Sequence, residues 1–239
     1  MCLMHPFRRD HFRAFLPLGL ILLAGLVAAC GGEQQPSARD IVTRAASATQ
    51  AQKSFHFVFD EKNGPTSTSG IHLVFAEGDV VVPDRVKADV SGTLQGVPLR
   101  SQLVVVAGKY YLKDPFTGKW QKVSASMNPV AFFDPAKGVL AVITSATQLE
   151  LVGTDKVGGA DAYHLKGKTT LSSITPLLGN APGARLVDLE LWVDKTTDRL
   201  ARLRLSGQVE KGDPAGAVRT VELSRYGVAV SIVAPQTGT

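Results

Sequence analysis

Short segments in which apolar and polar residues alternate constrain the fold of this chain more than any other feature. The clearest is 187–194, where aliphatic residues alternate with acidic residues and Trp192, and the same period of two recurs at 202–205 and 220–223. This period is typical of a β-strand with one buried and one solvated face. The segments are joined by tight turns such as Gln95-Gly96, whereas parallel strands require long crossover connections. The sequence therefore predicts an antiparallel meander with one buried side.

The same patterns predict an α+β fold with about ten strands, an N-terminal helix and a central helical insert. Ser37 caps a helix that runs to about Gln52, Asp134 begins a helix that runs to about Ala146, and Ser172–Leu178 forms a short helical segment. A sheet of this width twists and curls, and the helices are the natural cover for its concave face. The expected strands are Phe55–Asp60, Gly70–Ala76, Arg85–Leu94, Pro98–Ala107, Lys109–Lys113, Lys119–Val123, Gln148–Lys156, Ala160–Lys168, Val187–Asp194, Arg202–Leu205 and Thr220–Leu223.

Several side chains in and near the central helical insert are more apolar than a segment that only covers the sheet at the protein surface requires. Phe116, Phe132 and Phe133 lie in the sequence near the apolar helix segment Val139–Ile143. One interpretation is that they fill the core of the curled sheet. The other is that they line a cavity for an equally apolar ligand. The alternation of the sequence does not distinguish a filled core from a hollow one.

The N-terminal segment has the order of a secretory signal, in which basic residues precede the apolar run Leu16–Ala29 and Cys30 follows it. The run is shorter than the roughly 20 residues that span a bilayer, which disfavours an uncleaved membrane helix. A soluble signal peptide cleaved near Ala29 is the other alternative. A cysteine directly after Val27-Ala28-Ala29 resembles the lipobox of bacterial lipoproteins, whose cysteine is diacylated with chains such as palmitate.

This interpretation divides the chain into a signal peptide (1–29), the lipidated Cys30 with a short tether (30–37), a folded domain (38–235) and a C-terminal tail (236–239). We expect the N-terminal lipid anchor to hold the protein on the extracytoplasmic face of the cell membrane. Residues 31–37 reach about 24 Å when fully extended, so the domain is expected to lie close to the membrane surface.

Composition excludes several classes of function. Removal of residues 1–29 leaves 210 residues with 23 basic and 20 acidic side chains, a balance too mild to indicate a nucleic-acid partner. Cys2 leaves with the signal and Cys30 carries lipid, so the domain has no disulfide, no cysteine-ligated metal and no thiol nucleophile. We expect no cofactor and no metal site.

The sequence also lacks the signatures of common enzyme classes. Three histidines remain after removal of the signal, and His164, between Tyr163 and Leu165 on a predicted strand, is expected to face solvent. His56 and Asp60 lie on one face of a strand but about 13 Å apart, too far for an acid–base pair. The chain is therefore expected not to be an enzyme.

Four segments resemble the LppX/LprG family (LppX_LprAFG) of bacterial lipoproteins, best known from mycobacteria. They are Gly108–Trp120, Phe133–Gly138, Tyr163–Gly167 and Leu191–Thr196, and with the lipobox the resemblance extends over nearly the whole chain. The resemblance implies a strongly curved antiparallel half-barrel, similar to the LolA/LolB lipoprotein carriers, with helices over its concave face and a hydrophobic cavity between them. It also implies that residues 38–235 bind the acyl chains of lipids or lipoglycans, and it supplies no catalytic residues.

We therefore expect a monomeric lipid carrier of the cell envelope that exchanges its cargo with an envelope transporter. Phe132 and Phe133, at the start of the insert, are expected to gate the cavity. A scaffold with a solid core that docks an envelope protein is the alternative, and a lipid hydrolase ranks last because Ser101, Ser145 and Ser172 have no evident partner in the sequence. The expected acyl pocket, taken from the strand faces, comprises Phe57, Phe59, Leu73, Phe75, Leu103, Val105, Phe132, Phe133, Leu140, Ile143, Leu189 and Leu191.

Overall fold

The computed structural model describes residues 35–64, 71–124, 138–172, 185–209 and 212–237. The expected signal peptide and Cys30 lie outside the described residues. Pro36–Thr239 forms one compact unit, and the buried core residues of the described ranges lie within it. Within the described ranges, each helix is too short or too polar to cross a bilayer.

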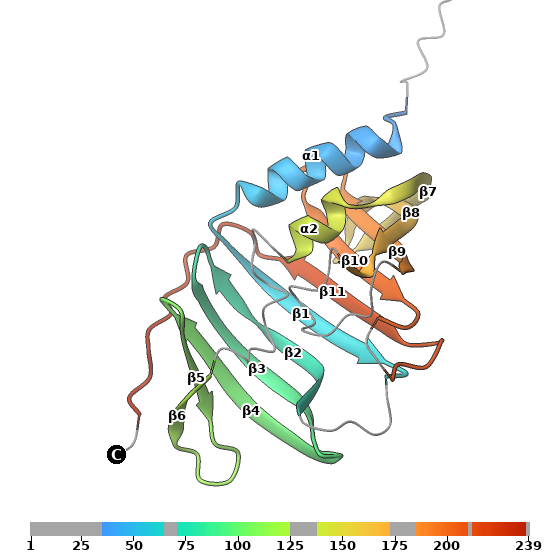
Figure 1. Ribbon diagram of the computed structural model, residues 1–239. Helices are drawn as coiled ribbons and strands as arrows, with labels where there is room; N and C mark the ends of the chain where they lie inside the picture. The colour runs from blue at the N-terminus through green and yellow to red at the C-terminus, as the bar shows by residue number, and fades with distance from the viewer. Residues whose placement is uncertain (1–34, 65–70, 125–137, 173–184, 210–211, 238–239) are drawn as a thin grey trace, which may run out of the picture. The chain divides into compact units, whose positions relative to one another are not determined.

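Two helices and eleven strands make up the described structure (Figure 1). The helices are α1 (Ala38–Gln50) and α2 (Val139–Thr144). The strands are β1 (Ser54–Lys62), β2 (Ile71–Val81), β3 (Arg85–Leu94), β4 (Val97–Val106), β5 (Lys109–Lys113), β6 (Trp120–Val123), β7 (Thr147–Val157), β8 (Ala160–Thr170), β9 (Leu186–Asp194), β10 (Leu200–Ser206) and β11 (Val218–Ser224).

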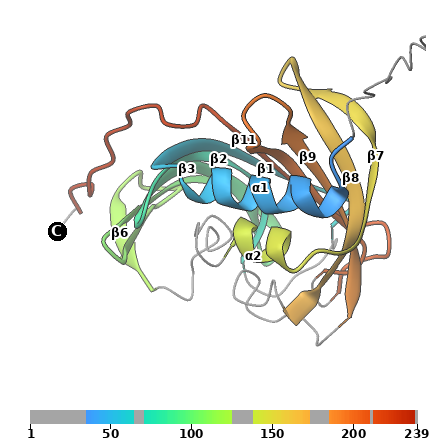
Figure 2. The same cartoon turned by 90° about the horizontal axis from the view of Figure 1, so that it is seen from above.

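The strands form a single antiparallel sheet in the order β6-β5-β4-β3-β2-β1-β11-β10-β9-β8-β7. The first and last strands meet in the middle of the sheet, with Phe57 opposite Leu223 and Phe59 opposite Val221. The edge strands, β6 and β7, follow one another in the chain, and the sheet is open between them. The sheet is also curved (Figure 2), which confirms the curved antiparallel meander predicted from the sequence.

Helix α1 begins where the sequence predicts, because the Ser37 hydroxyl oxygen accepts a hydrogen bond from the backbone N–H of Asp40 at 3.1 Å. Ile41, Val42 and Ala45 form its buried stripe. The stripe is narrow, so most of the helix surface remains polar.

Helix α2 is shorter in the structure than the sequence predicts. It starts after Gly138, which lacks a side-chain cap, and all four of its core residues lie between Val139 and Ile143. The expected start at Asp134 lies outside the described residues, as does the expected helical segment after Ser172.

One face of the sheet, which we call the core face, is continuous and apolar. Directly opposed residues on neighbouring strands share a face, so Phe59 lies beside Val221 on β11 and Ala76 on β2. Ile41 of α1 and Ile143 of α2 belong to the same buried cluster. Its strand residues are Phe55, Phe57, Phe59, Ala76, Val80, Val86, Ala88, Val90, Leu103, Val105, Leu165, Val187, Leu189, Leu191, Val193, Leu200, Leu203, Leu205, Val221 and Leu223.

The opposite face of the sheet is less uniformly solvated than the alternation predicts. Trp192 lies on this face but is only 3% exposed. The ring of His164 stacks on it with the ring centroids 4.4 Å apart, and the guanidinium carbons of Arg202 and Arg204 lie 5.2 and 5.0 Å from its centroid. His164 therefore lies on the predicted face but is covered by its neighbours.

Gly78 corrects one turn predicted from the sequence. The sequence predicts a turn at Glu77-Gly78-Asp79, but β2 continues through these residues to Val81. A Cβ atom on Gly78 would lie 2.1 Å from the carbonyl oxygen of Lys87 on β3. The glycine is therefore required by the close approach of two strands and not by a turn.

We expect Gly78→Ala to lower the free energy of unfolding by about 2 kcal/mol or more, because backbone atoms of β3 must move to admit a methyl group. Gly153→Ala is the matched control, since Gly153 also lies in a strand and a Cβ atom added there would have nothing within 4 Å. Urea denaturation of both variants measures the difference. Equal stability of the two variants would contradict this account of Gly78.

Candidate functional site

The core face brings together most of the residues expected to form an apolar pocket. These residues come from β1, β4, β9 and α2, and all of them belong to one buried cluster. Leu73 of β2 is partly buried and packs against the same cluster. The buried members of the expected pocket are Phe57, Phe59, Leu103, Val105, Leu140, Ile143, Leu189 and Leu191.

Phe75 is placed differently from the sequence prediction. The sequence puts Leu73 and Phe75 on one face, as residues two apart in a regular strand are. The pairing of β2 with β3 is irregular between these two residues, with Leu73 opposite Gly92 and Phe75 opposite Ser91. Phe75 also lies opposite Asp60, so it is on the face away from Phe59. The extra residue at the bulge separates the two side chains.

The two expected gate residues, Phe132 and Phe133, lie outside the described residues. The sequence analysis did not include some other members of the core face in the expected pocket, although they show the same alternation of apolar and polar residues. Val86, Ala88 and Val90 alternate along β3 and are buried beside the expected residues of β4. The alternation of apolar and polar residues along β3 is sufficient to predict that these three side chains face the core.

A group of buried polar side chains lies at one end of the core face. Glu61 and Arg219 oppose each other in the register two residues beyond Phe59 and Val221. We call Glu61, His72, Asp213 and Arg219 the Arg219 cluster, and all four are buried.

The charges of the Arg219 cluster are closely paired. Arg219 donates from Nη1 and Nη2 to the two carboxylate oxygens of Asp213 at 2.6 and 3.0 Å. Its Nη2 also lies 2.6 Å from Oε1 of Glu61, and the other oxygen of Glu61 contacts Nε2 of His72. Charge-assisted bonds of this kind fix the chain connection before β11 against β1 and β2. The apolar part of the core face therefore ends at a rigid charged group.

His56 and His164 lie on the opposite face, each between carboxylates. Nδ1 of His56 is 2.9 Å from Asp79, and its Nε2 is 3.3 Å from Glu77. His56 does not pair with Asp60, in agreement with the spacing argument. In the described residues, no set of three or more His, Cys, Asp or Glu side chains is placed so that it could hold a metal ion.

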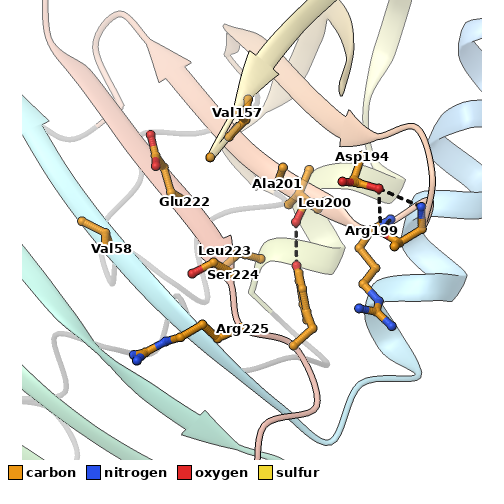
Figure 3. Close-up of a pocket in the computed structure, with 13 residues that line it drawn as sticks. Val58, Val157, Asp194, Arg199, Leu200, Ala201, Glu222, Leu223, Ser224 and Arg225 are labelled. Atoms are coloured by element: carbon orange, nitrogen blue, oxygen red, sulfur yellow. Dashed lines mark hydrogen bonds between the residues drawn. The ribbon is translucent and has the colours of Figure 1, made fainter. Parts of the chain in front are cut away.

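A pocket of about 290 Å³ opens near the end of β11, and its wall includes Leu200 and Leu223 of the core-face cluster (Figure 3). Glu222 and Arg225 line it together with Leu200, and both charged groups already have partners: Glu222 bonds to Arg202, and Arg225 to Asp79. None of the twelve residues expected to contact acyl chains lines this pocket. Because its wall mixes apolar side chains with paired charged groups, it suits an acyl chain less well than the core face does.

Tyr226 borders this pocket, and the pH dependence of the protein's stability tests whether its hydroxyl is buried. Its hydroxyl donates a hydrogen bond to the carbonyl of Leu200 at 2.6 Å, and burial raises its pKa well above the ordinary value of 10.0. Because the folded state holds this proton more tightly than the unfolded state, its contribution to stability is lost as the pH rises above about 10. We expect the free energy of unfolding to fall more steeply with pH in the native chain than in Tyr226→Phe. Parallel curves from urea denaturation across this pH range would contradict the burial of the hydroxyl.

Comparisons with known proteins agree with this geometry. The sequence profile of a family described as LppX_LprAFG lipoprotein matches residues 37–232. Among solved structures, LprF from Mycobacterium bovis is 20% identical with a TM-score of 0.68, and the match covers 85% of this chain and 99% of LprF. LppX from Mycobacterium tuberculosis is 17% identical with a TM-score of 0.59, covering 83% of this chain and 100% of LppX. Both share the fold of this chain.

A LolA superfamily protein from Nitrosomonas europaea is 11% identical with a TM-score of 0.31, and the match covers 82% of this chain and 96% of that protein. A comparison of the sequence with curated proteins gives no significant match.

Proposed function

Because the chain belongs to the LppX_LprAFG lipoprotein family, we propose that it binds the acyl chains of lipids or lipoglycans at the core face and carries or presents them in the cell envelope. The observation that supports this most is the continuity of the core face. Buried aliphatic and aromatic side chains extend from Val105 on β4 through Phe57 on β1 to Leu191 on β9. An uninterrupted apolar surface of this kind matches the chemistry of an acyl chain.

The binding energy comes from desolvation. Each methylene group removed from water contributes about 0.8 kcal/mol, so a long chain binds without any specific polar contact. The Arg219 cluster limits the apolar surface at one end, because a chain that displaced it would leave its charges unpaired in a buried place. The acyl chains therefore lie on the apolar part of the core face.

In this proposal, α1 and α2 cover the concave face and leave a cavity between helices and sheet. The contacts of the helices support it: α1 contacts α2 and the strands β7, β9 and β10. Leu140 and Ile143 point from α2 into the same cluster as the strand residues. Leu73 borders the cavity from β2, and Phe132 and Phe133 keep their proposed role as gate residues.

We propose that Cys30 carries the lipid anchor and holds the domain at the extracytoplasmic face of the cell membrane as a monomer. Helix α1 begins at Ala38, a few residues after this cysteine, so the domain stays near the bilayer that supplies or receives its cargo. An envelope transporter is the proposed exchange partner. The role is one of binding and not of catalysis.

Native mass spectrometry of residues 36–239, purified from a bacterial host without detergent, tests the proposed function. We expect co-purified lipid that leaves the protein on denaturation. A bare protein mass, with no uptake of added phospholipid or triacylglycerol, would contradict the proposal and favour the solid-core scaffold.

A further inference from the structure

Two hairpin turns lie at the same end of the sheet. The β3–β4 turn lies between Leu94 and Val97, which oppose each other in the register. Strand β5 runs antiparallel to β4 and leaves it after Leu112, which opposes Leu103, so the chain then heads toward the β3–β4 turn. Figure 1 shows both turns at the lower end of the sheet. We call this end, with the turn residues Asp114–Lys119, the hairpin end.

The hairpin end exposes large apolar side chains. Phe116 is 86% exposed, Val97 is 62% exposed and Leu94 is 42% exposed. Phe116 therefore neither fills the core nor lines a cavity, although both interpretations of the sequence assigned it there. Exposed apolar side chains gathered at one end of a sheet provide a surface that can contact a partner.

The turn that carries Phe116 is held together by hydrogen bonds to Asp114. One carboxylate oxygen of Asp114 accepts hydrogen bonds from the backbone N–H groups of Phe116 and Thr117 at 2.9 and 2.7 Å. The other oxygen accepts a bond from the side chain of Gln121 at 3.1 Å. These bonds lower the pKa of Asp114, with the bond from the backbone of Thr117 as the largest cause, and they fix the backbone of Phe116 in the turn.

A second turn in the same sheet shows that this geometry does not require an aromatic residue. Asp194 accepts the same two bonds, from the N–H groups of Thr196 at 2.9 Å and Thr197 at 2.7 Å. Thr196 occupies the place that Phe116 has in the first turn. The geometry of the turn therefore accounts for an aspartate at position 114, but it does not account for an aromatic residue at position 116.

The strands at the hairpin end carry an excess of positive charge. Between residues 94 and 123 there are five basic residues and a single acidic one, Asp114, whose carboxylate is already bonded within its turn. In the described part of the chain none of the five basic side chains forms an ion pair. They are Arg100, Lys109, Lys113, Lys119 and Lys122. Arg100, Lys113 and Lys119 lie nearest the hairpin end, whereas Lys109 lies beside the β4–β5 turn at the other end of these strands and Lys122 lies between the two ends.

We propose that the hairpin end docks on an anionic lipid bilayer, with Phe116 inserted among the headgroups and Arg100, Lys113 and Lys119 bound to lipid phosphates. Exposed aromatic and aliphatic side chains beside basic residues are the combination that such an interface favours. Each basic residue near an anionic surface strengthens binding about fivefold. This contact uses side chains outside the core face, so it is independent of what the core face binds.

Sedimentation of residues 36–239 with lipid vesicles tests the proposal, since this segment lacks Cys30 and any binding comes from its own surface. We expect binding to vesicles of phosphatidylcholine with phosphatidylglycerol, weakened by salt, and little binding to phosphatidylcholine alone. Phe116→Ser should weaken binding about tenfold, and Lys113→Gln and Lys119→Gln about fivefold each. Val152→Ser, which changes an exposed apolar residue on the other edge strand, should leave binding unchanged.

Three results would overturn the proposal: no binding to anionic vesicles, equal binding to neutral vesicles, or unchanged binding of Phe116→Ser and of both lysine variants. Thermal unfolding of each variant confirms that it is folded, as expected for substitutions at exposed positions. Native mass spectrometry of Phe116→Ser separates this proposal from the proposed function. We expect its bound lipid to be retained, and loss of that lipid would contradict the independence of the two surfaces.

Discussion

Replacing Ile143 by tryptophan should greatly reduce the lipid bound by residues 36–239 while the domain remains folded. Ile143 is fully buried in the cluster that α2 shares with the core face. In a cavity that holds acyl chains, the larger indole ring takes the place of lipid. Displacing two methylene groups already lowers affinity about tenfold, at about 0.8 kcal/mol each.

The same substitution distinguishes a hollow interior from a solid one. In a solid core the indole ring must force its neighbours apart, which typically lowers the free energy of unfolding by about 1–3 kcal/mol. Native mass spectrometry and urea denaturation on one preparation measure both effects. Val152→Trp, at an exposed position of β7, is the control and should change neither. Unchanged lipid with a large loss of stability would show that the pocket is not beside α2.

Arg219→Ala should destabilise the domain by about 3–5 kcal/mol, the second large effect that we expect. Arg219 is the partner of two buried carboxylates, Asp213 and Glu61. Its removal leaves negative charges in a place that water does not reach, which costs more than the loss of an exposed ion pair.

Arg225→Ala is the matched control, because Arg225 is an arginine at the end of the same strand, more than half exposed and paired with Asp79 at 3.1 Å. Its loss should change the free energy of unfolding by no more than about 1 kcal/mol. Urea denaturation of both variants measures the contrast. A similar small loss in both would mean that the Arg219 cluster does not hold the end of the core face together.

Much of the sheet could be predicted from the sequence, because tight hairpins leave little freedom in the bounds of their strands. The predicted bounds of β3 and β5 match the structure residue for residue. The turns beside them, Gln95-Gly96 and Ala107-Gly108, have positive φ at both residues, as the tightest hairpins require. Where such a turn follows a regular alternation, local sequence is sufficient.

Irregular strands and long-range contacts account for the differences. The face of Phe75 was not predictable, because the extra residue of the β2 bulge shifts the alternation and leaves no local signal. The burial of Trp192 depends on His164, Arg202 and Arg204, which come from neighbouring strands.

In the candidate site, too, the residues that follow a local alternation could be predicted, and those that depend on long-range contacts could not. The residues of β1, β4 and β9 on the core face could be predicted from a period of two. The Arg219 cluster could not, since Glu61 and Arg219 lie at opposite ends of the chain and meet only because β1 pairs with β11. The exposure of Phe116 also depends on the place of its turn at the end of the sheet and not on its neighbours in sequence.

Photo-crosslinking with a phospholipid that carries a diazirine near the end of one acyl chain tests the central claim most directly. After irradiation of residues 36–239 loaded with this lipid, mass spectrometry of peptides identifies the labelled strands. Acyl-chain binding at the core face predicts labels on β1, β4 and β9, at or beside Phe57, Leu103 and Leu191. Labels confined to the pocket beside Glu222 and Arg225, or no labels at all, would contradict it.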